Sequence, residues 1–181
     1  MYKVPRHRRQ RAAAELRRYT RSMSVWLYPL LLGLLASSSA VVAQDRDVEE
    51  CNAFVAVGEN YKTAHRNENC LRAAERGSGS AQYSVGMAYG FAGDRQLEEK
   101  YYRLAADQRS VAAYLALGHL LADRSPWESI YWYQRYVATK ADGYGYAALL
   151  LSKSFERLGE RGQAAYWLEV CSKSEYTGCT R

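Results

Sequence analysis

The chain has 181 residues and a formal net charge of +6, from 25 lysines and arginines against 19 aspartates and glutamates. Such an excess of basic residues is typical of proteins that bind nucleic acid or acidic lipid. The excess is confined to the start of the chain, where eight basic residues and one glutamate lie within the first 21 positions. Because the remaining chain is close to neutral, no nucleic acid is expected as a partner.

A signal peptide is predicted over residues 1–43. The basic segment is followed by 19 uncharged residues, from Val25 to Ala43, which contain the apolar run VWLYPLLLGLLA. The small residues that end this stretch place the expected cleavage before Gln44, which leaves 138 residues. Two alternatives stay open: an uncleaved anchor, since roughly 20 residues span a bilayer, and translation from Met23 instead of Met1. Either way, the basic residues stay in the cytoplasm and the rest of the chain is expected outside it. A cleaved chain would be periplasmic or secreted, and an uncleaved one would be anchored in the inner membrane with the repeats in the periplasm.

A repeated pair of helical patterns follows an expected linker at residues 44–50. The pattern AQYSVG with EEKYYRLAAD recurs as AYLALG with ESIYWYQRYV and again as AALLLS with QAAYWLEVCS, with spacings of 32 and 34 between the opening alanines. A period in the thirties that contains two helices is typical of an α/α solenoid. We therefore predict an all-α solenoid of about four antiparallel helix pairs. Its expected parts are a degenerate repeat at 51–79, repeats at 80–111, 112–143 and 144–173, and a C-terminal tail at 174–181.

Small residues in the first helix of each pair are expected to face large ones in the second. The small residues are Gly58, Gly86, Gly118 and Ser152, and from the second pair onward the second helices carry adjacent aromatic residues. Neighbouring helices interlock when small side chains oppose large ones. We therefore expect most of these aromatic residues to pack within and between repeats, and Ser125-Pro126 and the residues Asn67 and Asp94 to begin helices.

These helix pairs resemble the Sel-one-like repeats of the tetratricopeptide-like superfamily. The matching stretches are AQYSVG with EKYYRLAAD, and AYLALG with IYWYQRYVA, and the resemblance covers about residues 51–175. It departs from the family pattern at Tyr136, Ser152 and Leu168, which stand in place of an alanine, a glycine and a second aromatic residue. The resemblance implies a right-handed superhelix of antiparallel helix pairs that scaffolds protein complexes. Exported members look like assembly and adaptor factors of bacterial envelopes.

The four cysteines all follow the predicted signal peptide, and an even number in a small exported domain favours disulfides. Cys51 and Cys70 lie in the first repeat, whereas Cys171 and Cys179 lie at the other end of the chain. Helix pairs stack at roughly 10 Å each, so the two ends of the stack lie beyond the roughly 7 Å that a disulfide bridges between Cα atoms. We therefore predict Cys51 paired with Cys70, and Cys171 with Cys179. A metal site is the competing interpretation, and the spacings lack its usual pattern.

Residues that carry chemistry are few in this sequence. The two histidines outside the predicted signal peptide, His65 and His119, have no nucleophile or carboxylate at a motif spacing, and no phosphate-binding loop or metal motif is present. We predict no catalytic residue, metal or cofactor. If the first helices line a concave face, the residues that point into it form a partner-binding groove: Glu59, Tyr83, Met87, Leu115, His119, Leu149 and Lys153.

The expected function is a non-catalytic interaction scaffold in the bacterial cell envelope, which binds a protein or peptide along the first helices. Two other functions stay open. The first is a small hydrolase or penicillin-recognising enzyme, which the resemblance implies because some cysteine-stapled relatives are linked to such activity. The second is an inhibitor or immunity-like protein of an envelope enzyme.

Overall fold

The computed structural model describes residues 46–179, and the predicted signal peptide lies outside them. Every regular element in this range is helical, which confirms the all-α class. A helix over residues 46–55 is followed by a 3-10 helix, η1 (Asn60–Arg66). The further elements are α2 (Glu68–Glu75), α3 (Gly79–Phe91), α4 (Arg95–Asp107), α5 (Val111–Leu121), α6 (Pro126–Ala138), α7 (Tyr144–Arg157), α8 (Arg161–Ser172) and η2 (Thr177–Cys179).

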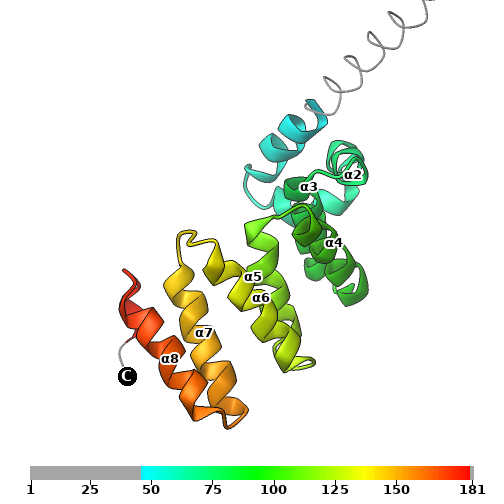
Figure 1. The fold of residues 1–181 in the computed structure, drawn as a ribbon. Coiled ribbons are helices and arrows are strands. Elements are labelled where there is room, and N and C mark those ends of the chain that lie inside the picture. Colours follow the sequence, from blue (N-terminus) through cyan, green and yellow to red (C-terminus); the bar gives the residue numbers. More distant parts are fainter. Residues whose placement is uncertain (1–45, 180–181) are drawn as a thin grey trace, which may run out of the picture. The chain divides into compact units, whose positions relative to one another are not determined.

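Consecutive helices pack against one another in pairs. The largest contacts are between α3 and α4, between α5 and α6, and between α7 and α8 (Figure 1). Smaller contacts join α4 to α5 and α6 to α7, so each pair touches the next along the chain. The first helix of each pair follows the recurring small-residue pattern in the sequence, and the second follows the aromatic pattern.

Local sequence explains where these helices begin. The side chain of Asn67 accepts a hydrogen bond from the amide of Cys70 at 3.0 Å, and Asp94 accepts one from the amide of Leu97 at 3.0 Å. These bonds satisfy amide groups that have no partner within the helix. Helix α6 begins at Pro126, as the sequence predicts, although the side chain of Ser125 makes no capping bond.

Helices α2 and α4 end in the same backbone motif with different residues. After α2, Gly77 has a φ of 90°, and the amide of Ser78 donates to the carbonyl of Ala73 at 2.9 Å. Arg109 occupies the equivalent position after α4, with a φ of 60°. The left-handed conformation is unfavourable for a residue with a Cβ atom, so Arg109 adopts a backbone that glycine would adopt more readily.

The predicted fit of small against large residues is present in the middle repeats. A Cβ atom on Gly86 would lie 2.9 Å from the ring of Tyr102, and one on Gly118 would overlap the ring of Tyr133. Ser152 is buried and donates a hydrogen bond to the carbonyl of Ala164 at 2.8 Å. Close approach of the paired helices therefore depends on these small side chains.

Two expectations for the first repeat are wrong. Residues 46–50, expected as linker, already form helix, because Asp47 is buried and forms ion pairs with Arg72 at 3.2 Å and Arg76 at 2.5 Å. Gly58, expected inside a first helix, lies after its end with a φ of 52°, and a Cβ atom there would meet nothing within 4 Å. The residues from 46 to Gly58 therefore pack differently from the first helices of the later helix pairs.

Both predicted disulfides are present. Cys51 pairs with Cys70, with Cα atoms 4.7 Å apart, and Cys171 pairs with Cys179, with Cα atoms 5.6 Å apart. The first joins the helix over residues 46–55 to α2, and the second joins α8 to η2. Two such pairs indicate an oxidising environment outside the cytoplasm.

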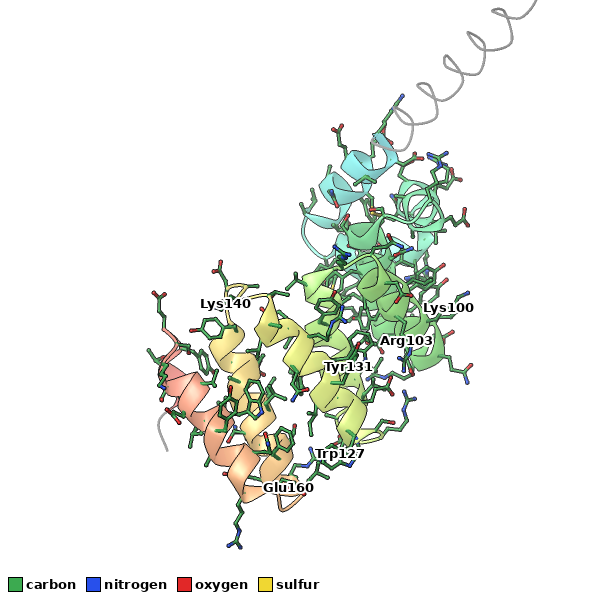
Figure 2. All side chains as sticks on the ribbon, in the orientation of Figure 1. Lys100, Arg103, Trp127, Tyr131, Lys140 and Glu160 are labelled. Carbon is green, nitrogen blue, oxygen red and sulfur yellow. A yellow bond between two sulfur atoms is a disulfide. The ribbon has the colours of Figure 1, made fainter. Side chains whose placement is uncertain are left out.

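The aromatic residues of the second helices divide between core and surface. Tyr102, Tyr133 and Tyr136 are buried, and Tyr101, Trp132 and Trp167 are partly buried, as the packing interpretation predicts. In contrast, Tyr131 and Tyr166 are 47% and 56% exposed. Figure 2 shows Tyr131 and Trp127 on α6, and Trp127 is also exposed.

Candidate functional site

A groove open to solvent lies between α3, α4, α5 and the loop that joins α6 to α7. It has a volume of about 740 Å³. Helix α5 contributes an apolar floor that includes Val111, Leu115 and Leu120, and the other elements contribute tyrosines and charged side chains. An apolar floor with a few polar groups around it is the usual composition of a ligand-binding site.

Two tyrosines stack on one side of this groove. Tyr83 from α3 and Tyr102 from α4 have ring centroids 5.6 Å apart and an interplanar angle of 25°. Burial raises the pKa of both phenols, and the negative charge of Glu98 further raises that of Tyr102. Both groups are therefore neutral at physiological pH, and they offer the groove aromatic surface without charge.

Glu98 is a buried carboxylate in the wall of the groove. It is 7% exposed and accepts a hydrogen bond at 2.7 Å from the guanidinium of Arg95. The side chain of Arg95 is itself 68% exposed. A Cβ atom on Gly90 would lie 2.5 Å from one Glu98 oxygen, so the glycine in α3 leaves the space that this carboxylate fills. Burying a carboxylate is costly without a cation and hydrogen bonds, and Arg95 provides both.

The opposite edge of the groove is formed by Tyr136 and Asp142. The hydroxyl of Tyr136 donates a hydrogen bond to the backbone carbonyl of Asp142 at 2.6 Å. This bond fixes the loop between α6 and α7 against the end of α6. Burial also raises the pKa of Tyr136, with a further contribution from the charge of Asp142.

His119 lies at the rim, next to the core. Its Nδ1 atom is 3.2 Å from the hydroxyl of Tyr133, and its ring contacts those of Tyr133 and Tyr146 at centroid distances of 5.6 and 6.0 Å. The residue is exposed at its edge, while desolvation of the rest of the ring lowers its pKa. His119 is thus a neutral, aromatic part of the rim at physiological pH.

The predicted groove residues do not form one site. Tyr83, Leu115 and His119 line the groove together. Met87 packs against the core cluster beneath it, whereas Leu149 and Lys153 line a separate pocket of about 180 Å³ beside Cys179. Glu59 lies in the turn before η1 and forms an ion pair with Lys62.

Sequence reasoning missed Arg95, Glu98, Tyr102, Tyr136 and Asp142, which also line the groove. They come from second helices and from the loop after α6, whereas the prediction considered first helices only. Glu98 in particular lies in the charged run LEEK, which gives no indication that one of its two glutamates is buried.

The described part of the chain, residues 46–179, contains no group of three or more histidine, cysteine, aspartate or glutamate side chains that would hold a metal ion. Within the same range, no helix has the length and apolar character needed to cross a membrane. Comparison of the chain with models of protein families, with curated proteins and with solved structures finds no match.

Proposed function

We propose that this protein is an exported adaptor of the Sel-one-like repeat type, which binds a segment of a partner protein in the groove over α5. The observation that carries the proposal is the composition of the groove: an apolar floor with stacked tyrosines on one side and a charged pair beside them. Extended peptides and amphipathic helices bind in grooves of this type, because apolar side chains fill the floor and polar groups fix the register.

Three further features support this proposal. Within residues 46–179, the larger contacts of each helix pair are with its neighbours in sequence, as in solenoid proteins that present a surface to partners. The disulfides indicate an extracytoplasmic location, and the basic and apolar segment at the start of the sequence fits export to the periplasm. Helices α3 and α5 contain AQYSVG and AYLALG, two of the stretches that carry the resemblance.

Site-specific photocrosslinking in intact cells tests the proposal. A photoreactive phenylalanine analogue replaces Leu115 in the groove, or Leu104, which is 38% exposed on α4 and does not line the groove. We expect a discrete crosslinked product from the Leu115 position and a much weaker one from the Leu104 position. A second change, Ala112→Trp, fills the groove from an exposed position on α5 and is expected to abolish the product. Equal crosslinking at both positions, or a product that persists after Ala112→Trp, would refute the proposal.

A further inference from the structure

The charged groups of the groove are unevenly balanced. Its charged side chains are Arg95, Glu98 and Asp142, so their formal charges sum to −1. The tyrosines on its walls do not change this sum at physiological pH, because burial raises the pKa of Tyr83, Tyr102 and Tyr136. The lowered pKa of His119 keeps the imidazole neutral as well. The groove therefore favours a positively charged ligand over a negatively charged one.

The two carboxylates differ in how they are satisfied. Glu98 is held by Arg95, which bonds it from an exposed position at the start of α4. Asp142 uses its backbone carbonyl to accept the bond from Tyr136, while no side chain among residues 46–179 donates to its carboxylate. Asp142 thus offers a carboxylate without a partner at one edge of an apolar surface.

The neighbouring aromatic rings suit a cation too. Lysine and arginine side chains lie favourably over tyrosine rings, and their methylene groups cover apolar surface. The structure already contains one such arrangement, since the guanidinium of Arg135 lies 5.2 Å from the ring centroid of Tyr114. Tyr83, which is partly buried, presents an aromatic ring inside the groove, and the buried Tyr102 stacks against it.

We propose that the segment bound in this groove carries a lysine or arginine that pairs with Asp142, next to an aliphatic side chain that packs on Leu115. This inference rests on the proposed function and specifies the chemistry of its partner. An acidic segment is disfavoured, because it would meet two carboxylates and a single arginine that is already paired with one of them. The cation of the partner pairs with the carboxylate of Asp142, while Glu98 stays paired with Arg95.

Selection from a phage-displayed library of random peptides tests this inference. The target is the disulfide-bonded protein purified from cells that express the full chain. We expect the selected peptides to be enriched in lysine or arginine beside leucine, isoleucine or valine. For such a peptide, Asp142→Asn is expected to weaken binding about tenfold, as is usual when a charged hydrogen-bonding partner is lost. Replacing the basic residue of the peptide with glutamine should weaken binding to a similar extent. Combining that peptide with the Asp142→Asn variant should weaken binding little further, because both changes remove the same interaction.

Glu160→Gln serves as the matched control, because Glu160 is exposed and precedes α8, at the opposite end of α7 from Asp142. Figure 2 shows Glu160 and Lys140 near opposite ends of α7. Binding to the Glu160→Gln variant should be unchanged. Asp142 is exposed, so its substitution is not expected to disturb the fold.

The groove-filling Ala112→Trp variant separates this inference from the proposed function. If selected peptides lose binding to this variant but show no enrichment in basic residues, the inference fails and the proposed function stands. If the peptides bind the groove but bind the Asp142→Asn variant as tightly as the native protein, the inference likewise fails and the proposed function stands. If the peptides bind the Ala112→Trp variant unchanged, the groove is not the binding site, and both proposals fail.

Discussion

The ring of Tyr133 lies directly against the backbone of Gly118, in a space that a methyl group on that residue would occupy. The two residues join α5 to α6, and a hydrogen bond of 2.6 Å from the hydroxyl of Ser129 to the carbonyl of Gly118 adds to the same contact. The hydroxyl of Tyr133 also lies 3.2 Å from Nδ1 of His119 at the rim of the groove. The packing of Tyr133 on Gly118 therefore positions part of the candidate site.

Substitution of Gly118 with alanine should destabilise the protein, because the ring of Tyr133 is 2% exposed and cannot move into solvent. Inserting a methyl group into a packed core costs about 1–3 kcal/mol. Gly162→Ala is the control, since a Cβ atom on Gly162 in α8 would meet nothing within 4 Å. That change should leave stability unchanged or raise it by roughly 0.5–1 kcal/mol through helix propensity. Urea unfolding measures the free energy of unfolding of both variants. An equal change in Gly118→Ala and Gly162→Ala would contradict the close packing of Tyr133 on Gly118.

Replacing Arg109 with glycine is expected to stabilise the protein. Arg109 has a φ of 60° at the end of α4, where a Cβ atom is unfavourable. The gain from removing it, about 1–2 kcal/mol, exceeds the entropic cost of glycine in the unfolded chain, so the net increase should be roughly 0.5–1 kcal/mol. The reverse change, Gly77→Ala at the end of α2, should destabilise, because Gly77 has a φ of 90° with open space around it. An unchanged midpoint of thermal unfolding for Arg109→Gly would show that this backbone is not strained.

Removal of the disulfides should reduce stability to different extents. The Cys51–Cys70 bond separates its cysteines by 19 positions and the Cys171–Cys179 bond by 8. In the chain-entropy model, their loss costs about 3 kcal/mol and about 2.5 kcal/mol respectively. Paired alanine substitutions, compared by denaturant unfolding under non-reducing conditions, provide the measurement. A larger loss at the shorter loop would indicate that packing of η2 against α7, and not loop closure, dominates at that end.

Stability should fall at alkaline pH. Burial raises the pKa of Tyr133 to about 12, above the ordinary value of 10.0 in the unfolded chain. The unfolded state therefore loses its proton first, so the stabilisation is complete below pH 10 and is lost as the pH rises toward 12. The shift corresponds to about 2–3 kcal/mol of stability across this window. Tyr133→Phe should flatten the decline without abolishing it, since Tyr102 is shifted in the same direction. Unfolding midpoints of the native protein and of Tyr133→Phe, measured from pH 8 to pH 11.5, test this prediction. An identical fall of the midpoint with pH in both proteins would count against a raised pKa for Tyr133.

Local patterns in the sequence predicted much of the fold. The recurring alanine and glycine positions located the helix pairs around Gly86 and Gly118, because close backbone contact restricts side-chain size in a way that leaves a visible repeat. The cysteine pairs followed from the order of the repeats. The start of the first helix at Arg46 was missed, since Asp47 pairs with Arg72 and Arg76, which lie 25 and 29 residues away in sequence.

The candidate site was only partly predictable. Tyr83 and Leu115 occupy equivalent positions on first helices, and His119 lies one helical turn after Leu115, so their common face could be inferred. The inward orientation of Glu98 depends on the missing side chain at Gly90 in the facing helix, and the position of Asp142 depends on a bond from Tyr136 to the loop backbone. Such contacts between elements leave no periodic pattern in the sequence.

The two disulfides also determine which part of the molecule unfolds locally first. Arrays of helices ordinarily unravel from their ends, because a terminal helix has a neighbour on one side only. Here each end is covalently attached to the element beside it, through Cys51–Cys70 and Cys171–Cys179. The least costly opening therefore moves inward, to the smaller interfaces of α4 with α5 and of α6 with α7. Since both α4 and α5 line the groove, the groove lies at one of these smaller interfaces, and an opening there would change its width while both ends of the chain stay covalently closed.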